Sequence, residues 1–378
     1  MKKIKKNFLV IFSLVSIFLF GLVNQVFAKE KFPKLEGKIL YQTQFDRVLS
    51  TKKKGVSPNN GFIYIEPNFS LNLNQNWAIK TQWRLQPNDV LTTRNQTNPE
   101  RYRTLLSSDR GVNFSEMGFL VEEIKMQFHN DDIKIFAGKF DPNFGTAHRK
   151  SKRMGVFTSQ FAEDYNLREK IGIGATALLE SSQITFNTFF NDNTDLSRSA
   201  INNRGRARRS DGLAGNTSTI SSYSLNMEGE DLFGFKNLFY NLGYRSLGVD
   251  KSINTSRETG YVVGAEYLHK ISKETSLIPF FEYVALKNLS GIKGRDSQYS
   301  TVALIGNYRN WISSFALQMR NIDKNYLIDR HVFDRQLQLS IGYKFTNNLT
   351  IDVSRAEIRE DAKRGSLLGI NMSYVQKF

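Results

Sequence analysis

The feature that most constrains this chain is an alternation of apolar and polar residues that recurs along most of its length. Four stretches show it clearly: WAIKTQWRL at 77–85, QITFNTFFN at 183–191, NLFYNLGYR at 237–245 and RQLQLSIGYK at 335–344. A period of two residues is typical of a β-strand whose two faces meet different surroundings. No segment keeps a 3.6-residue apolar period over three turns, so the pattern predicts an all-β protein.

Alternation alone fits two architectures, because the apolar face can point to a protein core or to lipid. The links between the strands separate the two, since short and long links follow one another in turn. This order predicts about sixteen antiparallel strands, with both ends of the chain on the short-turn side. The long links cover roughly 50–60, 87–115, 141–168, 192–217, 247–258, 288–297, 321–331 and 358–366. Short periplasmic turns, long external loops and an even strand number are typical of a transmembrane antiparallel β-barrel.

The first 28 residues have the build of a secretory signal peptide. Four lysines within the first six residues precede an apolar run from Phe8 to Val23, and Val26 and Ala28 provide the small side chains of a cleavage site. The apolar run is shorter than the ~20 residues of a spanning helix, which favours cleavage over a membrane anchor. We therefore expect a signal peptide at 1–28 and a barrel at 29–378.

Charge and composition limit the classes of partner that this protein can bind. Removal of the four lysines with the signal peptide would lower the formal net charge from +16 to +12. Export argues against nucleic acid as the partner of this charge, which leaves anionic solutes or the phosphates of a membrane surface. The chain has no cysteine, so neither disulfides nor thiol chemistry is expected, and we expect no metal or other cofactor.

The last residues, GINMSYVQKF, place Ile370, Met372 and Tyr374 on one strand face and end on Phe378. This stretch resembles the C-terminal signal of Gram-negative outer-membrane proteins, although Gln376 departs from its apolar pattern. The resemblance implies recognition by the barrel-assembly machinery. Closure of a barrel would pair this strand with the first one, near 35–45, and leave no open edge.

The chain beyond the signal peptide resembles a bacterial porin in its strand number, its signal peptide and its terminal Phe. This resemblance implies a homotrimer in the Gram-negative outer membrane, in contact with lipid and lipopolysaccharide, with one water channel in each subunit. The stretch FAGKFDPNFGTAHR at 136–149 also resembles a strand exit of the phosphate-selective porin O/P family. Sixteen strands enclose a lumen too wide for side chains to fill. We therefore expect passive diffusion of small hydrophilic solutes.

The third long link, 141–168, is the candidate constriction, because the third external loop folds into the barrel in sixteen-stranded porins. A surface loop whose charges are merely solvated is the alternative. The candidate constriction residues are Arg149, Lys150, Lys152, Arg153, Glu163 and Asp164. Basic residues around a narrow pore favour anions, so we expect an anion preference.

Parity along the strands predicts six charged residues on the lumen wall: Lys80, Arg84, Arg245, Arg320, Glu66 and Glu266. We expect the three arginines near the external strand ends, where they either form a basic vestibule or extend to the interface. A second basic cluster, with Arg204, Arg206, Arg208 and Arg209, lies in the fourth long link. We expect it to be solvated or to contact lipid phosphate or a neighbouring subunit, rather than to bind a solute.

Two other functions stay open. An outer-membrane phospholipase or protease would need a catalytic base, and the chain has four histidines: His129, His148, His269 and His331. Only His331 has a nearby acid at the external rim, Asp329, and no HExxH or phosphate-binding loop is present. An adhesin or receptor that displays its loops is the third possibility.

Overall fold

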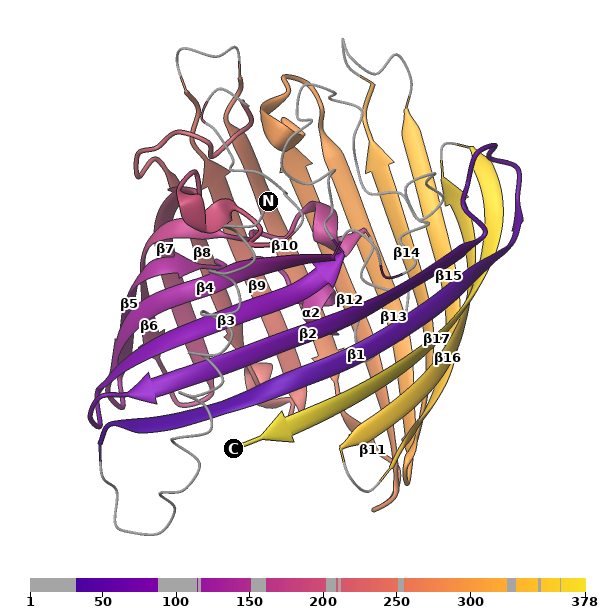
Figure 1. Ribbon diagram of the computed structural model, residues 1–378, viewed down its shortest axis with the longest axis horizontal. Helices are drawn as coiled ribbons and strands as arrows, with labels where there is room; N and C mark the ends of the chain where they lie inside the picture. The colour runs from indigo at the N-terminus through magenta and orange to yellow at the C-terminus, as the bar shows by residue number, and fades with distance from the viewer. Residues whose placement is uncertain are drawn as a thin grey trace, which may run out of the picture.

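The computed structural model describes residues 32–87, 114, 117–150, 161–201, 209, 212–250, 255–324, 331–345, 348–360 and 362–378 (Figure 1). The predicted signal peptide at 1–28 lies outside these residues. Within them, no helix is long and apolar enough to cross a membrane.

The described residues form one closed antiparallel sheet. Its strands are β1 (Lys34–Thr51), β2 (Asn59–Asn72), β3 (Trp77–Pro87), β4 (Met117–His129), β5 (Ile133–Phe140), β6 (Lys170–Leu178), β7 (Ser182–Asn191), β8 (Ser222–Gly229), β9 (Leu238–Leu247), β10 (Glu258–Tyr267), β11 (His269–Lys270), β12 (Thr275–Lys287), β13 (Ser297–Tyr308), β14 (Trp311–Ile322), β15 (Val332–Lys344), β16 (Leu349–Glu360) and β17 (Lys363–Lys377). The two-residue β11 continues β10 along the same partner, β12. The wall therefore has sixteen strands, which confirms the predicted barrel.

Each strand pairs with its neighbours in the sequence, and β1 closes the ring by pairing with β17. The register at this seam runs from Lys38 opposite Lys377 to Thr51 opposite Gly365. At the end of the seam, the backbone groups of Gly37 and Phe378 exchange two hydrogen bonds of 3.1 Å. The last strand is thus bonded on both edges, and the described sheet is closed.

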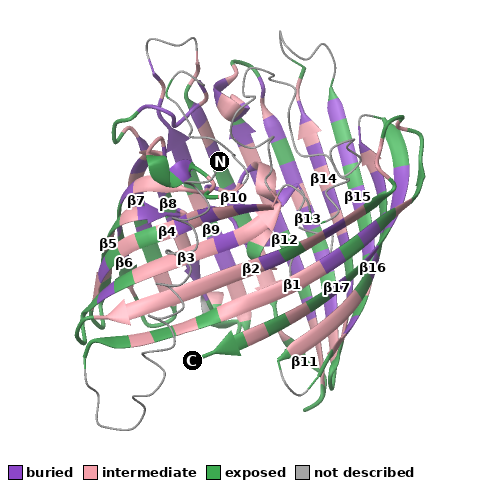
Figure 2. Cartoon of the chain, in the orientation of Figure 1, coloured by how far each residue is buried: buried purple, intermediate pink, exposed green. Residues whose placement is uncertain are grey.

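Buried and exposed residues alternate along many of the strands (Figure 2). Many of the exposed residues are apolar and many of the buried ones are polar, which is the polarity of a membrane barrel. On β15, Leu337, Leu339 and Ile341 point outward and are exposed, while Gln336 and Gln338 point inward and are buried. Apolar groups gain nothing from contact with water, so this outward face is suited to lipid. At the short-turn end, Trp311 and Tyr343 pack edge to face on the outward face, with ring centroids 4.9 Å apart.

Short and long links alternate as predicted, with one exception. The expected long link at 358–366 is wrong, because β16 extends to Glu360 and β17 begins at Lys363, directly opposite it. Charged residues there belong to the strands, with Arg355 and Glu357 forming an exposed ion pair of 2.8 Å. In the sequence, this polar stretch of two strands has the composition of a loop.

Candidate channel constriction

The link between β5 and β6 enters the lumen instead of continuing the wall. Of this loop, residues 141–150 and 161–169 are described, including α2 (Ala147–Lys150) and the 3-10 turn η3 (Ala162–Asp164). Because β5 ends at Phe140, the upper edge of β4 has no strand beside it. The link after β7 covers this edge: Ala200 N–H donates to the carbonyl of Phe119 at 2.9 Å, and Ser199 Oγ accepts from Phe119 N–H.

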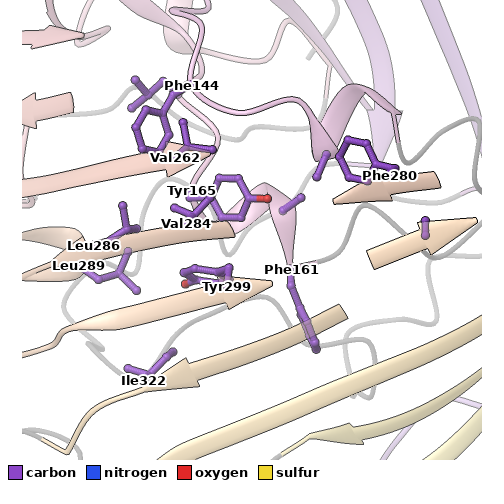
Figure 3. Packing of buried hydrophobic residues seen from close by; sticks show 14 of the residues in the cluster. Phe144, Phe161, Tyr165, Val262, Phe280, Val284, Leu286, Leu289, Tyr299 and Ile322 are labelled. Carbon is purple, nitrogen blue, oxygen red and sulfur yellow. The ribbon is translucent and has the colours of Figure 1, made fainter. Parts of the chain in front are cut away.

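Apolar residues from both arms of the loop pack on one side of the barrel interior. Phe144, Phe161 and Tyr165 are almost fully buried in one cluster with Val284 and Tyr299 of the wall (Figure 3). The Tyr165 and Tyr299 rings pack edge to face, with centroids 5.1 Å apart. Burial of these side chains against β10, β12 and β13 holds the loop to that side of the lumen.

Glu282 of β12 joins the two arms of the loop. Its carboxylate is 1% exposed and accepts hydrogen bonds from the backbone N–H groups of Thr146 (2.5 Å) and Ala147 (3.1 Å). It also accepts from the hydroxyls of Thr146 (3.0 Å) and Tyr165 (2.7 Å). A buried carboxylate is stable only when it is hydrogen-bonded in this way, so the wall and the loop depend on one another here.

Two wall arginines add ionic contacts to the loop. Arg320 of β14 is fully buried between Asp164 of the loop (2.8 Å) and Asp334 of β15 (2.5 Å), with its guanidinium 4.3 Å from the ring centroid of Phe161. Arg245 of β9 donates to the carbonyl of Tyr165 and to Glu258 at 2.5 Å. The loop therefore meets the wall through paired charges as well as apolar surface.

The α2 residues contact the wall lower in the barrel. Arg149 pairs with Glu228 of β8 at 3.2 Å and is 45% exposed on its side chain. Lys150 pairs with Glu266 of β10 at 2.8 Å and lies 3.9 Å above the ring of Phe239. Arg149 is thus the basic residue of this helix that solvent reaches most freely.

The wall on the other side of β5 carries its own charge network. Arg84 of β3 lies 3.2 Å from both Glu66 of β2 and Glu122 of β4, and its guanidinium is 5.3 Å from the ring centroid of Tyr64. Glu122 is the extra residue of a β-bulge, where the register moves from Gln82–Glu123 to Trp83–Val121. The bulge brings two consecutive carboxylates, Glu122 and Glu123, to the inward face.

No protein-family model matches the chain, and no curated protein matches its sequence. Among solved structures, the chain is similar to the outer membrane channel DcaP of Acinetobacter baumannii, with a TM-score of 0.56, 11% identity, and coverage of 93% of this chain and 100% of that chain. It is also similar to Acinetobacter baumannii OccAB3 (TM-score 0.52, 10% identity, 91% and 100% covered) and to Pseudomonas aeruginosa OccK8 (OprE) (TM-score 0.50, 10% identity, 91% and 98% covered). The chain has the fold of an outer-membrane porin.

Within this porin fold, the structure places the six predicted wall residues on the inward face. Arg84, Arg245 and Arg320 are buried in ion pairs, so they do not line an open vestibule. In the predicted constriction, Arg149 and Lys150 pair with the wall, Asp164 pairs with Arg320, and Glu163 pairs with Arg168 at 2.6 Å. Lys152 and Arg153 lie outside the described residues.

Of the second basic cluster, Arg209 is described and pairs with Asp250 of the neighbouring β9–β10 link. This contact raises the pKa of the Arg209 guanidinium, through a hydrogen bond and the charge of the carboxylate. Arg204, Arg206 and Arg208 lie outside the described residues.

Sequence reasoning missed Glu282 and two lysines. Glu282 is the one carboxylate in the stretch IPFFEYVALK, where it shares the inward face with Phe280 and Val284. A lone acid between apolar inward residues was a usable signal. Lys125 of β4 lies directly opposite Lys80 of β3, and Lys134 of β5 is on the same inward face nearby. These three residues form what we call the lysine triad, which strand pairing reveals and the sequence does not.

The histidines form no cluster that suggests catalysis. His331 lies 3.5 Å from Asp323 at the exposed rim, and His129 and His269 lie at the short-turn end. In the part of the chain that the structure describes, no group of three or more His, Asp or Glu residues could hold a metal ion.

Proposed function

We propose that this protein is an outer-membrane porin that forms a water-filled channel for passive diffusion of small hydrophilic solutes. The observation that carries the proposal is the one-sided position of the β5–β6 loop. Inward residues on the loop side, such as Gln318 and Asn241, are buried, whereas Gln42, Asn68 and Gln82 on β1–β3 are half-exposed. A polar wall that solvent reaches on one side of a packed loop has the arrangement of a narrowed aqueous path.

The similarity to the outer membrane channel DcaP of Acinetobacter baumannii supports transport over the catalytic alternative. Export through a cleaved signal peptide at 1–28, insertion by the barrel-assembly machinery and a homotrimeric state are parts of the same proposal. The narrower resemblance to phosphate-selective porins at 136–149 stays a hypothesis about the solute.

We further propose that the channel prefers anions, and that the lysine triad contributes most to this preference. The wall arginines are neutralised by neighbouring acids, whereas Lys80 and Lys125 oppose each other across two strands. Within the triad, Lys125 contacts Glu123 at 2.8 Å, which leaves an excess of positive charge on this wall. Only charges close to the path matter, since the Debye length is about 8 Å in physiological salt.

Single-channel recording in planar bilayers with a salt gradient tests both proposals. We expect open channels with a reversal potential of the sign for anion preference. K80Q/K125Q/K134Q should move the reversal potential towards cation selectivity, because it removes three positive charges from the path. The matched control K52Q/K54Q/K293Q removes three exposed lysines at the long-loop rim and should change it little.

Neutralising Arg149, Lys150, Lys152 and Arg153 should also move the reversal potential towards cations, because it leaves Glu228 and Glu266 uncompensated. A wild-type channel that prefers cations would overturn the proposed selectivity and leave the porin assignment standing. The absence of any conductance from folded protein would overturn the porin assignment itself.

A further inference from the structure

Three arginines stand in one register row on the outward face of the barrel. Arg335 of β15 lies directly opposite Arg359 of β16, which lies directly opposite Arg364 of β17. Arg335 shares the face of the exposed residues Leu337 and Leu339, so the row faces away from the lumen. We call Arg335, Arg359 and Arg364 the arginine row.

This arrangement is unfavourable without an anion. Neighbouring strands are only about 4.8 Å apart, and like charges directly opposite one another destabilise a sheet. Among the residues that the structure describes, no carboxylate lies within ion-pair distance of any of the three. One row further from the long-loop end, Glu357 lies between Leu337 and Ser366 on the same face, and its carboxylate pairs with Arg355 at 2.8 Å. The row is therefore a concentration of positive charge with no ion-pair partner among the described residues.

The surroundings of the row match the boundary between water and lipid. The row lies at the long-loop end of its strands, since Arg359 is the last residue but one of β16 and Arg364 is the second residue of β17. Four positions further from this end, Arg355 and Arg47 flank Leu368 in another row. The next outward row is wholly apolar and consists of Ile341, Val353, Ile370 and Phe45.

Towards β14 the row loses its charge, whereas at its other end the exposed Lys52 lies beside Arg364 and donates its backbone N–H to the Arg364 carbonyl at 3.0 Å. The same register row continues from Arg335 to Met319 of β14, Ser300 of β13 and Tyr283 of β12, none of which is charged. Directly above the row, β16 and β17 are joined by only two residues, so no long loop connects the two strands there.

We propose that the arginine row binds the phosphates of a phosphorylated lipid in the outer leaflet, whose acyl chains lie along the outward apolar side chains further down the same strands, from Leu337 and Leu339 to Ile341. Guanidinium groups bind phosphate through paired, charge-assisted hydrogen bonds, and three of them on adjacent strands suit a headgroup with more than one phosphate. This inference rests on the outer-membrane location proposed above. It assigns lipid binding to the strand wall rather than to the basic cluster at 204–209.

The test compares two probes in detergent micelles with the folded full-length protein: lipid A with its two phosphates, and the same lipid after removal of both. Native mass spectrometry measures the affinity of each. We expect the wild type to prefer the phosphorylated lipid by about tenfold or more. R335Q/R359Q/R364Q should lose most of that preference, while R335K/R359K/R364K should keep part of it, because lysine retains the charge without the fork of donors.

The control variant K270Q/K273Q/R309Q removes the same charge from exposed positions at the short-turn end and should leave the preference unchanged. Heat-dependent gel mobility confirms that each variant is folded. An equal loss of preference in the control, or no preference in the wild type, would overturn the proposal. So would a glutamine variant that dissociates into monomers with unchanged lipid affinity, because the row would then be a contact between subunits. Channel conductance should stay unchanged in the glutamine variant, so failure of lipid binding is distinguishable from failure of the porin function.

Discussion

Glu282 shows how much one residue can decide in this barrel. It is the point where both arms of the β5–β6 loop meet the wall, through four hydrogen-bond donors. Parity placed Lys80, Arg84 and Arg320 on a face of the wall from sequence alone. The alternation of side-chain direction along a strand cannot identify hydrogen-bond or ion-pair partners, because those depend on where a distant loop lies. The sequence marks Glu282 as a lone acid among apolar inward residues, but its partners in the loop are seen only in the fold.

Glu282→Gln should loosen the loop. The amide nitrogen of glutamine cannot accept a hydrogen bond, so at least one donor of Thr146, Ala147 or Tyr165 is left unpaired, at a cost of about 1–3 kcal/mol. We expect larger or noisier single-channel conductance with the barrel still folded. Tyr165→Phe, which removes one donor, should have a smaller effect. Recordings of the glutamine variant that match the wild type would contradict this role for Glu282.

Asp141 should make the channel sensitive to pH. Burial, together with the nearby carboxylates of Glu122 and Glu123, raises the pKa of Asp141 to about 8. The carboxyl is thus mostly neutral at pH 7 and mostly charged at pH 9, so raising the pH adds close to one negative charge. We expect the reversal potential to move towards cation selectivity over this range. Asp141→Asn should reduce the movement, because the amide carries no charge at either pH, and an unchanged pH response in that variant would assign it to another group.

At the scale of elements, sequence predicted the strands far better than their ends. Alternation and turn residues located the sixteen strands because both are local properties of the chain. The short hairpin between β16 and β17 was not predicted, because charged residues at the outer end of a strand resemble a loop in composition. The bulge at Glu122 was not predicted, because an inserted residue interrupts the two-residue period by which a strand is recognised in the sequence.

The terminal Phe378 of the last strand should be needed for assembly of the barrel. The ring of Phe378 packs against Phe69 of β2, with centroids 5.7 Å apart, while Ile370, Met372 and Tyr374 face outward on β17. Phe378→Ser should leave export intact and sharply lower the amount of folded, heat-modifiable protein in the outer membrane. Phe345→Ser, at another exposed aromatic of the short-turn end, is the matched control. Normal yields of folded protein from Phe378→Ser would contradict the assembly role.

The whole molecule is asymmetric in a way that strand counting does not reveal. One part of the wall is covered by the loop and its apolar cluster, and the other presents half-exposed polar side chains. Strand number and link lengths predicted the closed cylinder, because those quantities fix the topology. Which part of the cylinder the loop covers depends on contacts between loop and wall, such as that of Phe161 with Arg320, and those contacts are a property of the folded state.

The seam between β1 and β17 also has a consequence for the time course of folding. Every other pairing in the barrel joins strands that follow one another, whereas the seam joins residues more than 300 positions apart. Non-local contacts form slowly, since the entropy of a large loop must be lost before they stabilise anything. We infer that the chain passes through an open sheet with two unpaired edges, and that closure is its last and slowest step. Such edges readily add strands from other molecules, so the interval before closure is when this protein is most prone to aggregate.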